Sequence, residues 1–201
     1  MGKIIDKQNP TCVGLDTSFS YLPDIMGAGA NSLEDAAQAM LMWKRGSIGA
    51  VSDSVPSVKG QIAYYEQYGT AGLHAFYETL RYAKEQGLVV ITDAKRNDIG
   101  ATASQYAAAF LGETNVGENT FSAFPSDFLT VNGYLRSDGI TPFVDQCQKH
   151  DKGIFVLVKT SNPSSGELQN LKPEEGRPAH ELLGTMVERL AHGPPGKSRH
   201  C

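Results

Sequence analysis

Four charged residues, Asp93, Lys95, Arg96 and Asp98, lie close together in the stretch VVITDAKRNDIGATA. The residues just before them are apolar, mostly β-branched and preceded by a glycine, which favours a short strand covered on both faces. Nearby carboxylates favour the charged form of a lysine between them, which makes it a poor nucleophile and a well-positioned acid. The spacing therefore indicates acid or electrostatic chemistry at the end of a buried strand.

The directions of these side chains follow from strand geometry. Alternation along a strand predicts that Asp93 and Lys95 project to one side and Ala94 to the other. Gly100 lets the backbone turn, so Asp98 can point into the same site or into a neighbouring subunit. The structural alternative is a salt bridge at the rim of a sheet with Arg96 merely solvated, since short motifs also occur by chance.

Polar side chains also follow the other predicted strands, which supports the functional interpretation. These side chains are Asp16, Lys59, Asn132 and Ser161. The predicted strands are residues 12–15, 54–58, 88–92, 128–131 and 153–158. Helical signals stand between strands: an N-cap with an acidic first turn at residues 31–35, and apolar residues at helical spacing over 72–86.

Alternating strands and helices predict a parallel sheet with helical crossovers and a shared site at the carboxyl ends of the strands. An open doubly wound sheet and a (β/α)8 barrel both place their sites there. The segment after the first strand, GLDTSFSY, lacks the glycine fingerprint of dinucleotide-binding sheets, so we favour the barrel. Residues 113–127 are predicted to be a loop, and residues 161–178 a mobile segment above the site.

Composition limits the function classes. The chain has 201 residues, 40% of them hydrophobic and 20% charged, which suits one globular domain. A net charge of −4 offers no basic field for nucleic acid or an anionic membrane. The three cysteines are far apart and odd in number, as expected of free thiols in a reducing cytosol. With a polar start and no long apolar stretch, we expect a cytoplasmic chain that does not span a membrane.

The segment DAKRNDIGAT resembles the signature of the orotidine 5′-phosphate decarboxylase family, and the surrounding blocks resemble its bacterial type 2 branch. The further blocks are CVGLDTS at 12–18, SVPSVKGQIAYYEQYG at 54–69, FLTVNGYLRSDGITPF at 128–143 and GIFVLVKTSNPSSGELQ at 153–169. The resemblance covers residues from about 10 to about 185. It implies a homodimeric (β/α)8 barrel that converts orotidine 5′-monophosphate to UMP in pyrimidine synthesis, without a metal or an organic cofactor.

The resemblance also implies roles for individual residues. Lys95 is the cation beside the leaving carboxylate and the proton donor to C6, and Asp93 and Asp98 brace it. Asp98 reaches across from the partner subunit. The implied substrate-binding residues are Asp16 and Lys59 at the ribose hydroxyls, Thr102 at the partner's ribose and Ser161 at the pyrimidine edge. Loss of carbon dioxide leaves a carbanion-like centre, which a fixed ammonium stabilises.

The chain departs from the family pattern in two ways. Gly60 and Gly133 stand where the family usually has proline, and Arg136 where it has glycine. By our count five of eight strands are present, which predicts a partial barrel over residues 1–190 and an atypical tail over 191–201 from a truncated or frame-shifted end. The strands beyond normally carry the glycine and arginine that bind the substrate phosphate.

Two alternatives follow from these departures. The first is another phosphosugar decarboxylase or epimerase of the same barrel superfamily, in which D-x-K-x-x-D helps to bind a magnesium enediolate. The second is an inactive truncated remnant that binds nucleotide weakly or only assembles.

Overall fold

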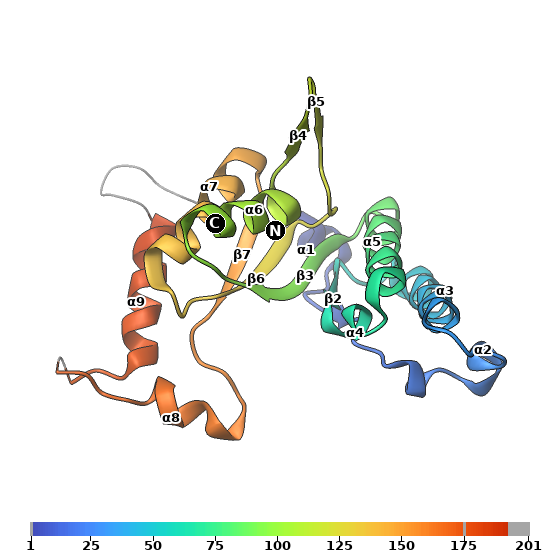
Figure 1. Ribbon diagram of the computed structural model, residues 1–201, viewed down its shortest axis with the longest axis horizontal. Helices are drawn as coiled ribbons and strands as arrows, with labels where there is room; N and C mark the ends of the chain where they lie inside the picture. The colour runs from blue at the N-terminus through green and yellow to red at the C-terminus, as the bar shows by residue number, and fades with distance from the viewer. Residues whose placement is uncertain (1, 175, 193–201) are drawn as a thin grey trace. The chain divides into compact units, whose positions relative to one another are not determined.

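The computed structural model describes residues 2–174 and 176–192 and divides into two compact units (Figure 1). The first unit comprises Met1–Ala94 and Ala123–Phe128, and the second comprises Lys95–Ser122 and Leu129–Cys201. The single domain predicted over residues 1–190 stays a prediction, and most of the predicted tail, from residue 193 onward, lies outside the described residues. None of the helices in the described part of the chain is long and apolar enough to cross a membrane.

The first unit contains three neighbouring strands. They are β1 (Cys12–Gly14), β2 (Ser57–Gln61) and β3 (Val89–Arg96), and the last two residues of β3 belong to the second unit. The strand β2 pairs in parallel with both β1 and β3, as predicted from the alternation of strands and helices. It begins directly after Pro56, later than predicted, because a proline has no N–H group to donate to a sheet.

The helices of the first unit precede β1 or connect the three strands. They are α1 (Gly2–Lys7), the 3-10 helix η1 (Phe19–Tyr21), α2 (Asp24–Gly27), α3 (Leu33–Val51), α4 (Ala63–Glu66) and α5 (Gly69–Glu85). The predicted N-cap of α3 is confirmed, because the side chain of Ser32 accepts a hydrogen bond of 3.0 Å from the N–H of Asp35. Gly87, with a φ of 73°, follows the end of α5.

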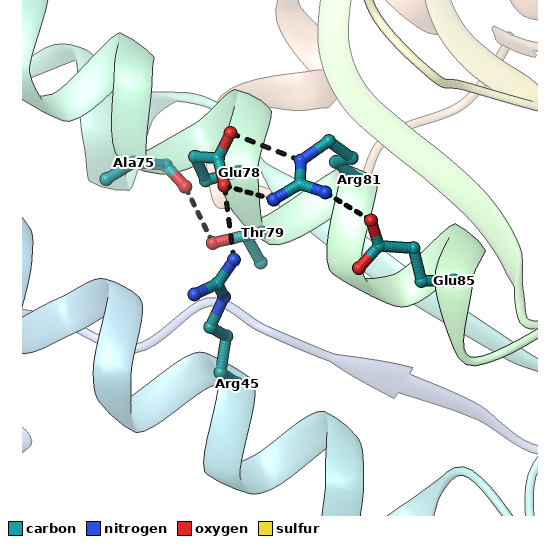
Figure 2. Close-up of polar contacts among 6 residues, drawn as sticks. All are labelled: Arg45, Ala75, Glu78, Thr79, Arg81 and Glu85. Atoms are coloured by element: carbon teal, nitrogen blue, oxygen red, sulfur yellow. Dashed lines mark hydrogen bonds and ion pairs between the residues drawn. The ribbon is translucent and has the colours of Figure 1, made fainter.

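The two long helices of this unit, α3 and α5, pack against each other (Figures 1 and 2). Arg45 of α3 lies 3.1 Å from Glu78 of α5, and Arg81 binds both Glu78 and Glu85 along α5. Ion pairs this exposed are screened by solvent and stabilise a fold little, so burial of apolar side chains is the larger stabilising effect. The large apolar side chains of the two helices that are fully buried are Met40, Ile48, Phe76 and Leu80.

The second unit contains the remaining strands and helices. Its elements are α6 (Gly100–Leu111), β4 (Thr114–Val116), β5 (Asn119–Phe121), β6 (Phe128–Asn132), α7 (Arg136–His150), β7 (Gly153–Leu157), η2 (Pro163–Ser165), α8 (Gly166–Gln169) and α9 (Ala179–His192). The strands β6 and β7 are neighbours, α6 packs against α7, and α7 also contacts β7 and α9. Phe128, the first residue of β6, belongs to the first unit.

The prediction that residues 113–127 form only a loop is wrong. The strands β4 and β5 pair as an antiparallel hairpin whose two-residue turn starts with Gly117, at a φ of 61° (Figure 1). A left-handed glycine in a two-residue turn is the usual connection of a hairpin. Gly117, one of the residues that suggested a loop, therefore belongs to this hairpin turn. The predicted mobile segment at 161–178 contains the short helices η2 and α8.

One lysine lies in the core of the first unit. Lys44 of α3 is fully buried, and its Nζ donates hydrogen bonds to the carbonyl oxygens of Leu15 and Thr17. Its Nζ also lies 5.4 Å from the centre of the Tyr65 ring, within the range of a cation–π contact. Burial lowers the pKa of Lys44 to about 8, although the negative charge of Asp16 opposes this shift. At neutral pH the buried amine is therefore mostly an ammonium ion.

The carboxylate of Asp127 generates a first prediction about stability. Its Oδ2 accepts a hydrogen bond of 2.8 Å from the N–H of Val90, a fully buried residue of β3, and its Oδ1 lies 2.7 Å from Lys84 Nζ. We expect Asp127→Ala to lower the free energy of unfolding by about 1–3 kcal/mol, because the Val90 N–H loses its acceptor. Lys84→Ala, the matched control, should cost under about 1 kcal/mol in urea unfolding. Equal losses in the two variants would contradict this explanation.

The pKa of Lys44 generates a second prediction. In the unfolded chain the amine titrates near 10.5, so between about pH 8 and 10.5 the unfolded state binds more protons than the folded state. Stability must then rise with pH in this window. We expect a gain of about 2 kcal/mol between pH 7 and 9.5 that is absent in Lys44→Met, measured by urea unfolding at both values. The same gain in both proteins would show that other groups cause it.

Candidate functional site

Three charged side chains meet at the carboxyl ends of the strands of the first unit. Lys59 Nζ lies 2.7 Å from Asp16 Oδ2 and 3.2 Å from Asp93 Oδ2. The other oxygen of Asp16, Oδ1, accepts a hydrogen bond of 3.3 Å from the backbone N–H of Gln61. One ammonium thus joins the carboxylate of Asp16, which follows β1, to that of Asp93, which lies within β3 rather than after it as predicted.

The register of the strands explains this meeting. A Cβ placed on Gly60 would lie 3.2 Å from the Phe76 ring of α5, so this position faces the helix and Lys59 faces the opposite side. Gln61 is paired with Asp93 in the ladder between β2 and β3, which puts Asp93 diagonally across from Lys59 on the same face. Asp16 stands two residues after Gly14, the partner of Lys59 in the ladder between β1 and β2.

The electrostatics of this cluster keep the lysine charged. Partial burial acts to lower the pKa of Lys59, but hydrogen bonds and charge interactions with Asp16 and Asp93 outweigh it and raise the pKa overall. Asp93 is buried and Asp16 half-buried, so the carboxylates are only partly solvated. The arrangement presents fixed positive and negative groups that can bind hydroxyl groups of a ligand.

The other predicted site residues lie in the second unit. They are Lys95, Asp98, Thr102 and Ser161. The structure therefore brings together Asp16, Lys59 and Asp93 within one unit, whereas the predicted contacts of these residues with the second group stay predictions.

Lys95 has an unusual backbone for a residue in a strand. Its φ is 49°, in the left-handed region that non-glycine residues seldom adopt, and its backbone N–H donates a hydrogen bond of 2.9 Å to Thr130 Oγ1. Regular alternation assumes an extended backbone, which Lys95 lacks, so the prediction that Lys95 projects beside Asp93 stays a prediction. The side chain of Lys95 is exposed. A strained residue at a strand end is a frequent feature of functional sites.

Arg96 is not merely solvated, as the structural alternative supposed. Its guanidinium lies 5.4 Å from the centre of the Tyr106 ring and 5.6 Å from that of Phe110, both on α6. These contacts pack the end of β3 against the helix that follows. Asp98 lies between the two elements, and its Oδ1 accepts a hydrogen bond of 2.7 Å from the N–H of Ile99.

Thr102 and Ser161 are both exposed. Thr102 lies in the first turn of α6, where its N–H donates to the carbonyl oxygen of Ile99. Ser161 follows β7 in a loop that Gln169 of α8 fixes: Gln169 Oε1 accepts from the N–H of Thr160 at 2.9 Å, and its Nε2 donates to Thr160 Oγ1 at 2.8 Å. The polar edge that carries Ser161 is therefore held from within the same unit.

Sequence reasoning missed two residues that order these groups, Lys44 and Gln169. A usable signal existed for Lys44, which stands four residues after Met40 and four before Ile48 on the buried stripe of α3. A lysine at such a position is unusual enough to indicate a special role. No comparable signal marks Gln169, because its contacts with Thr160 depend on how the loop folds.

Comparison with known proteins identifies the family. Residues 29–188 match the family model described as the orotidine 5′-phosphate decarboxylase / HUMPS family. The orotidine 5′-phosphate decarboxylase of Clostridium novyi is 39% identical over 194 residues, which cover 96% of this chain and 63% of that protein. The orotidine 5′-phosphate decarboxylase of Rhodopirellula baltica is 42% identical over 182 residues, which cover 90% and 59%.

Solved structures agree with this identification. The OMP decarboxylase of Leishmania donovani is 28% identical with a TM-score of 0.69, over 96% of this chain and 64% of that one. A Streptomyces avermitilis protein assigned to the same activity is 29% identical with a TM-score of 0.80, over 99% and 65%. These matches confirm the predicted fold class, part of a (β/α)8 barrel.

The chain spans about 63% of the length of the Clostridium novyi relative. The family match nevertheless covers residues 29–188, most of this chain, and includes Lys59 and Asp93, whereas Asp16 lies before it. The chain belongs to the orotidine 5′-phosphate decarboxylase / HUMPS family.

Proposed function

We propose that this chain acts as an orotidine 5′-phosphate decarboxylase, a carboxy-lyase that converts orotidine 5′-monophosphate to UMP in pyrimidine synthesis. The observation that carries the proposal is Lys59 held between Asp16 and Asp93 at the ends of parallel strands, in a chain of this family. Such a cluster suits a ligand with adjacent hydroxyl groups, as in a ribose. The proposed reaction uses neither a metal nor an organic cofactor.

In the proposed reaction the bond between C6 and the carboxylate breaks, and its electron pair stays on C6 as carbon dioxide leaves. The ammonium of Lys95 stabilises this charge, then transfers a proton to C6, and the neutral amine regains a proton from solvent. A cation fixed in advance does this without the cost of reorienting solvent. The strained backbone of Lys95 at a strand end supports its role, because such strain is frequent at active sites.

The remaining residues bind and orient. We propose that Asp93 and Asp98 brace the ammonium of Lys95, with Asp93 beside the leaving carboxylate. Asp16 and Lys59 bind the ribose hydroxyls, and Ser161 contacts the pyrimidine edge. Binding energy from the ribose lowers the barrier only if it holds the reacting carbon in place, so the rigidity of the cluster around Lys59 matters for turnover.

We further propose a homodimer in which Asp98 and Thr102 reach into the partner's site. Asp98 is half-buried and Thr102 exposed, and both lie at the start of α6, where a second copy can reach them. The proposed location is the cytoplasm. The net charge of −4 gives no support for nucleic acid as a partner.

The first test of this function is the absorbance change of orotidine 5′-monophosphate with the purified chain, with and without EDTA. We expect turnover that survives EDTA and falls at least about a thousandfold in Lys95→Ala, because that variant lacks both the fixed charge and the proton donor. Lys149→Ala, an exposed lysine on α7, is the matched control and should keep normal turnover. Loss of activity with EDTA would favour a magnesium-dependent phosphosugar enzyme, and a folded chain without turnover would indicate an inactive remnant.

Mixing inactive variants tests the shared site. If Asp98 acts across the dimer, then a heterodimer of Lys95→Ala and Asp98→Ala has one intact site, and random mixing should restore about a quarter of the normal activity. A mixture of Lys95→Ala with Asp93→Ala should restore none, because the proposal places both residues in the same subunit's site. Activity measured after co-refolding checks this, and failure of the first mixture to recover would exclude the crossing of Asp98.

A further inference from the structure

The residues on both sides of Asp16 are held by a buried lysine that the proposed reaction does not use. Lys44 Nζ donates to the carbonyl oxygen of Leu15, which precedes Asp16, and to that of Thr17, which follows it, at 3.3 Å. The N–H of Leu15 also donates to the carbonyl oxygen of Lys59 at 2.8 Å. The backbone that carries Asp16 is thus fixed from α3 on one side and from β2 on the other.

Core packing alone does not account for a lysine at this position. Lys44 lies on the apolar stripe of α3, where a residue such as methionine would fill similar space. Burial of an ammonium ion carries a large desolvation cost unless its hydrogen bonds are made. Here the hydrogen bonds go to two carbonyl groups of one short segment, the segment that orients Asp16.

The charges around Lys44 point to the same residue. The negative charge of Asp16 acts on Lys44 through space, while Lys59 binds the Asp16 carboxylate directly at 2.7 Å. The other group that faces the Lys44 ammonium is the buried ring of Tyr65. Asp16 is therefore held through its backbone by one buried cation and through its carboxylate by a second, partly exposed one.

We propose that Lys44 is a positioning residue: by binding the carbonyl groups that flank Asp16, it sets the direction in which the Asp16 carboxylate meets the hydroxyl groups of the nucleotide's ribose. This inference rests on the proposed function for the identity of the ligand. The arrangement of Lys44, Asp16 and Gln61 can be tested without turnover.

The first readout is amide hydrogen exchange at Gln61, whose N–H donates to Asp16 Oδ1. If Lys44 positions Asp16, then Lys44→Met should lower the protection of this amide about tenfold more than the loss of global stability accounts for. Ile48→Val is the matched control, because it weakens the same buried stripe of α3 by about 1 kcal/mol and keeps the ammonium of Lys44 with its hydrogen bonds to the segment of Asp16. An equal change at Gln61 in both variants would overturn the proposal.

The second readout is a double-mutant cycle on UMP affinity, measured by calorimetry. We expect Lys44→Met to raise the Kd of UMP about tenfold in the normal chain, but less than about twofold when Asp16 is already replaced in Asp16→Asn. A purely structural role for Lys44 would weaken binding by the same factor in both backgrounds, and that result would overturn the proposal. Lys44→Gln, which keeps one donor group, replaces Lys44→Met if the latter does not fold.

The two readouts separate this inference from the proposed function. If the normal chain neither binds UMP nor consumes orotidine 5′-monophosphate, but Gln61 loses protection in Lys44→Met, then the function is wrong and the positioning of Asp16 by Lys44 stands. If UMP binds and the cycle shows no coupling between Lys44 and Asp16, then positioning is wrong and the function stands.

Discussion

The described site depends on one interaction, the binding of the Lys59 ammonium to the carboxylates of Asp16 and Asp93. The ammonium lies within 3.2 Å of a carboxylate just after β1 and of another within β3, and it is itself carried by the strand between them, β2. Without this cation between them, the negative charges of Asp16 and Asp93 would repel each other. A parallel ladder brings such residues together because the carboxyl ends of its strands meet at one edge. The strand register therefore positions the three charges of the cluster.

Two lysines serve this cluster in different ways. Lys59 neutralises the carboxylates directly, and its pKa is raised because their attraction outweighs partial burial. Lys44 is fully buried and bonds to backbone carbonyl groups, and its pKa falls to about 8 because burial dominates. The opposite pKa shifts indicate that the carboxylates stabilise the charged form of Lys59, whereas burial destabilises the charged form of Lys44. That cost is reasonable only if the fixed backbone beside Asp16 has a use.

Much of this arrangement follows from sequence patterns of short range. The approximate positions of β1, β2, β3, β6 and β7, though not their exact ends, were predictable from apolar runs, and the start of α3 was predictable from Ser32 and Asp35, because these signals act within a few residues. The hairpin around Gly117 was missed, since Asn and Gly suit both loops and hairpin turns. Arg136 has a left-handed φ of 60°, which suits the glycine usual at that position in the family. No local sequence pattern predicts this backbone conformation. The backbone of Lys95 and the burial of Lys44 depend on long-range packing.

Sites of this kind reduce stability locally, and the surrounding structure must compensate. A left-handed lysine costs about 1–3 kcal/mol, and a buried ammonium costs more unless its hydrogen bonds are complete. In the first unit the apolar contacts of α3 and α5 supply the compensation, since Met40, Phe76 and Leu80 are fully buried and the last two pack against Gly60 of β2. The same helix α3 contributes both Met40 to the core and Lys44 to the segment of Asp16. A change that shifts this helix would therefore act on the apolar core and on the segment of Asp16 together, because one helix contributes to both.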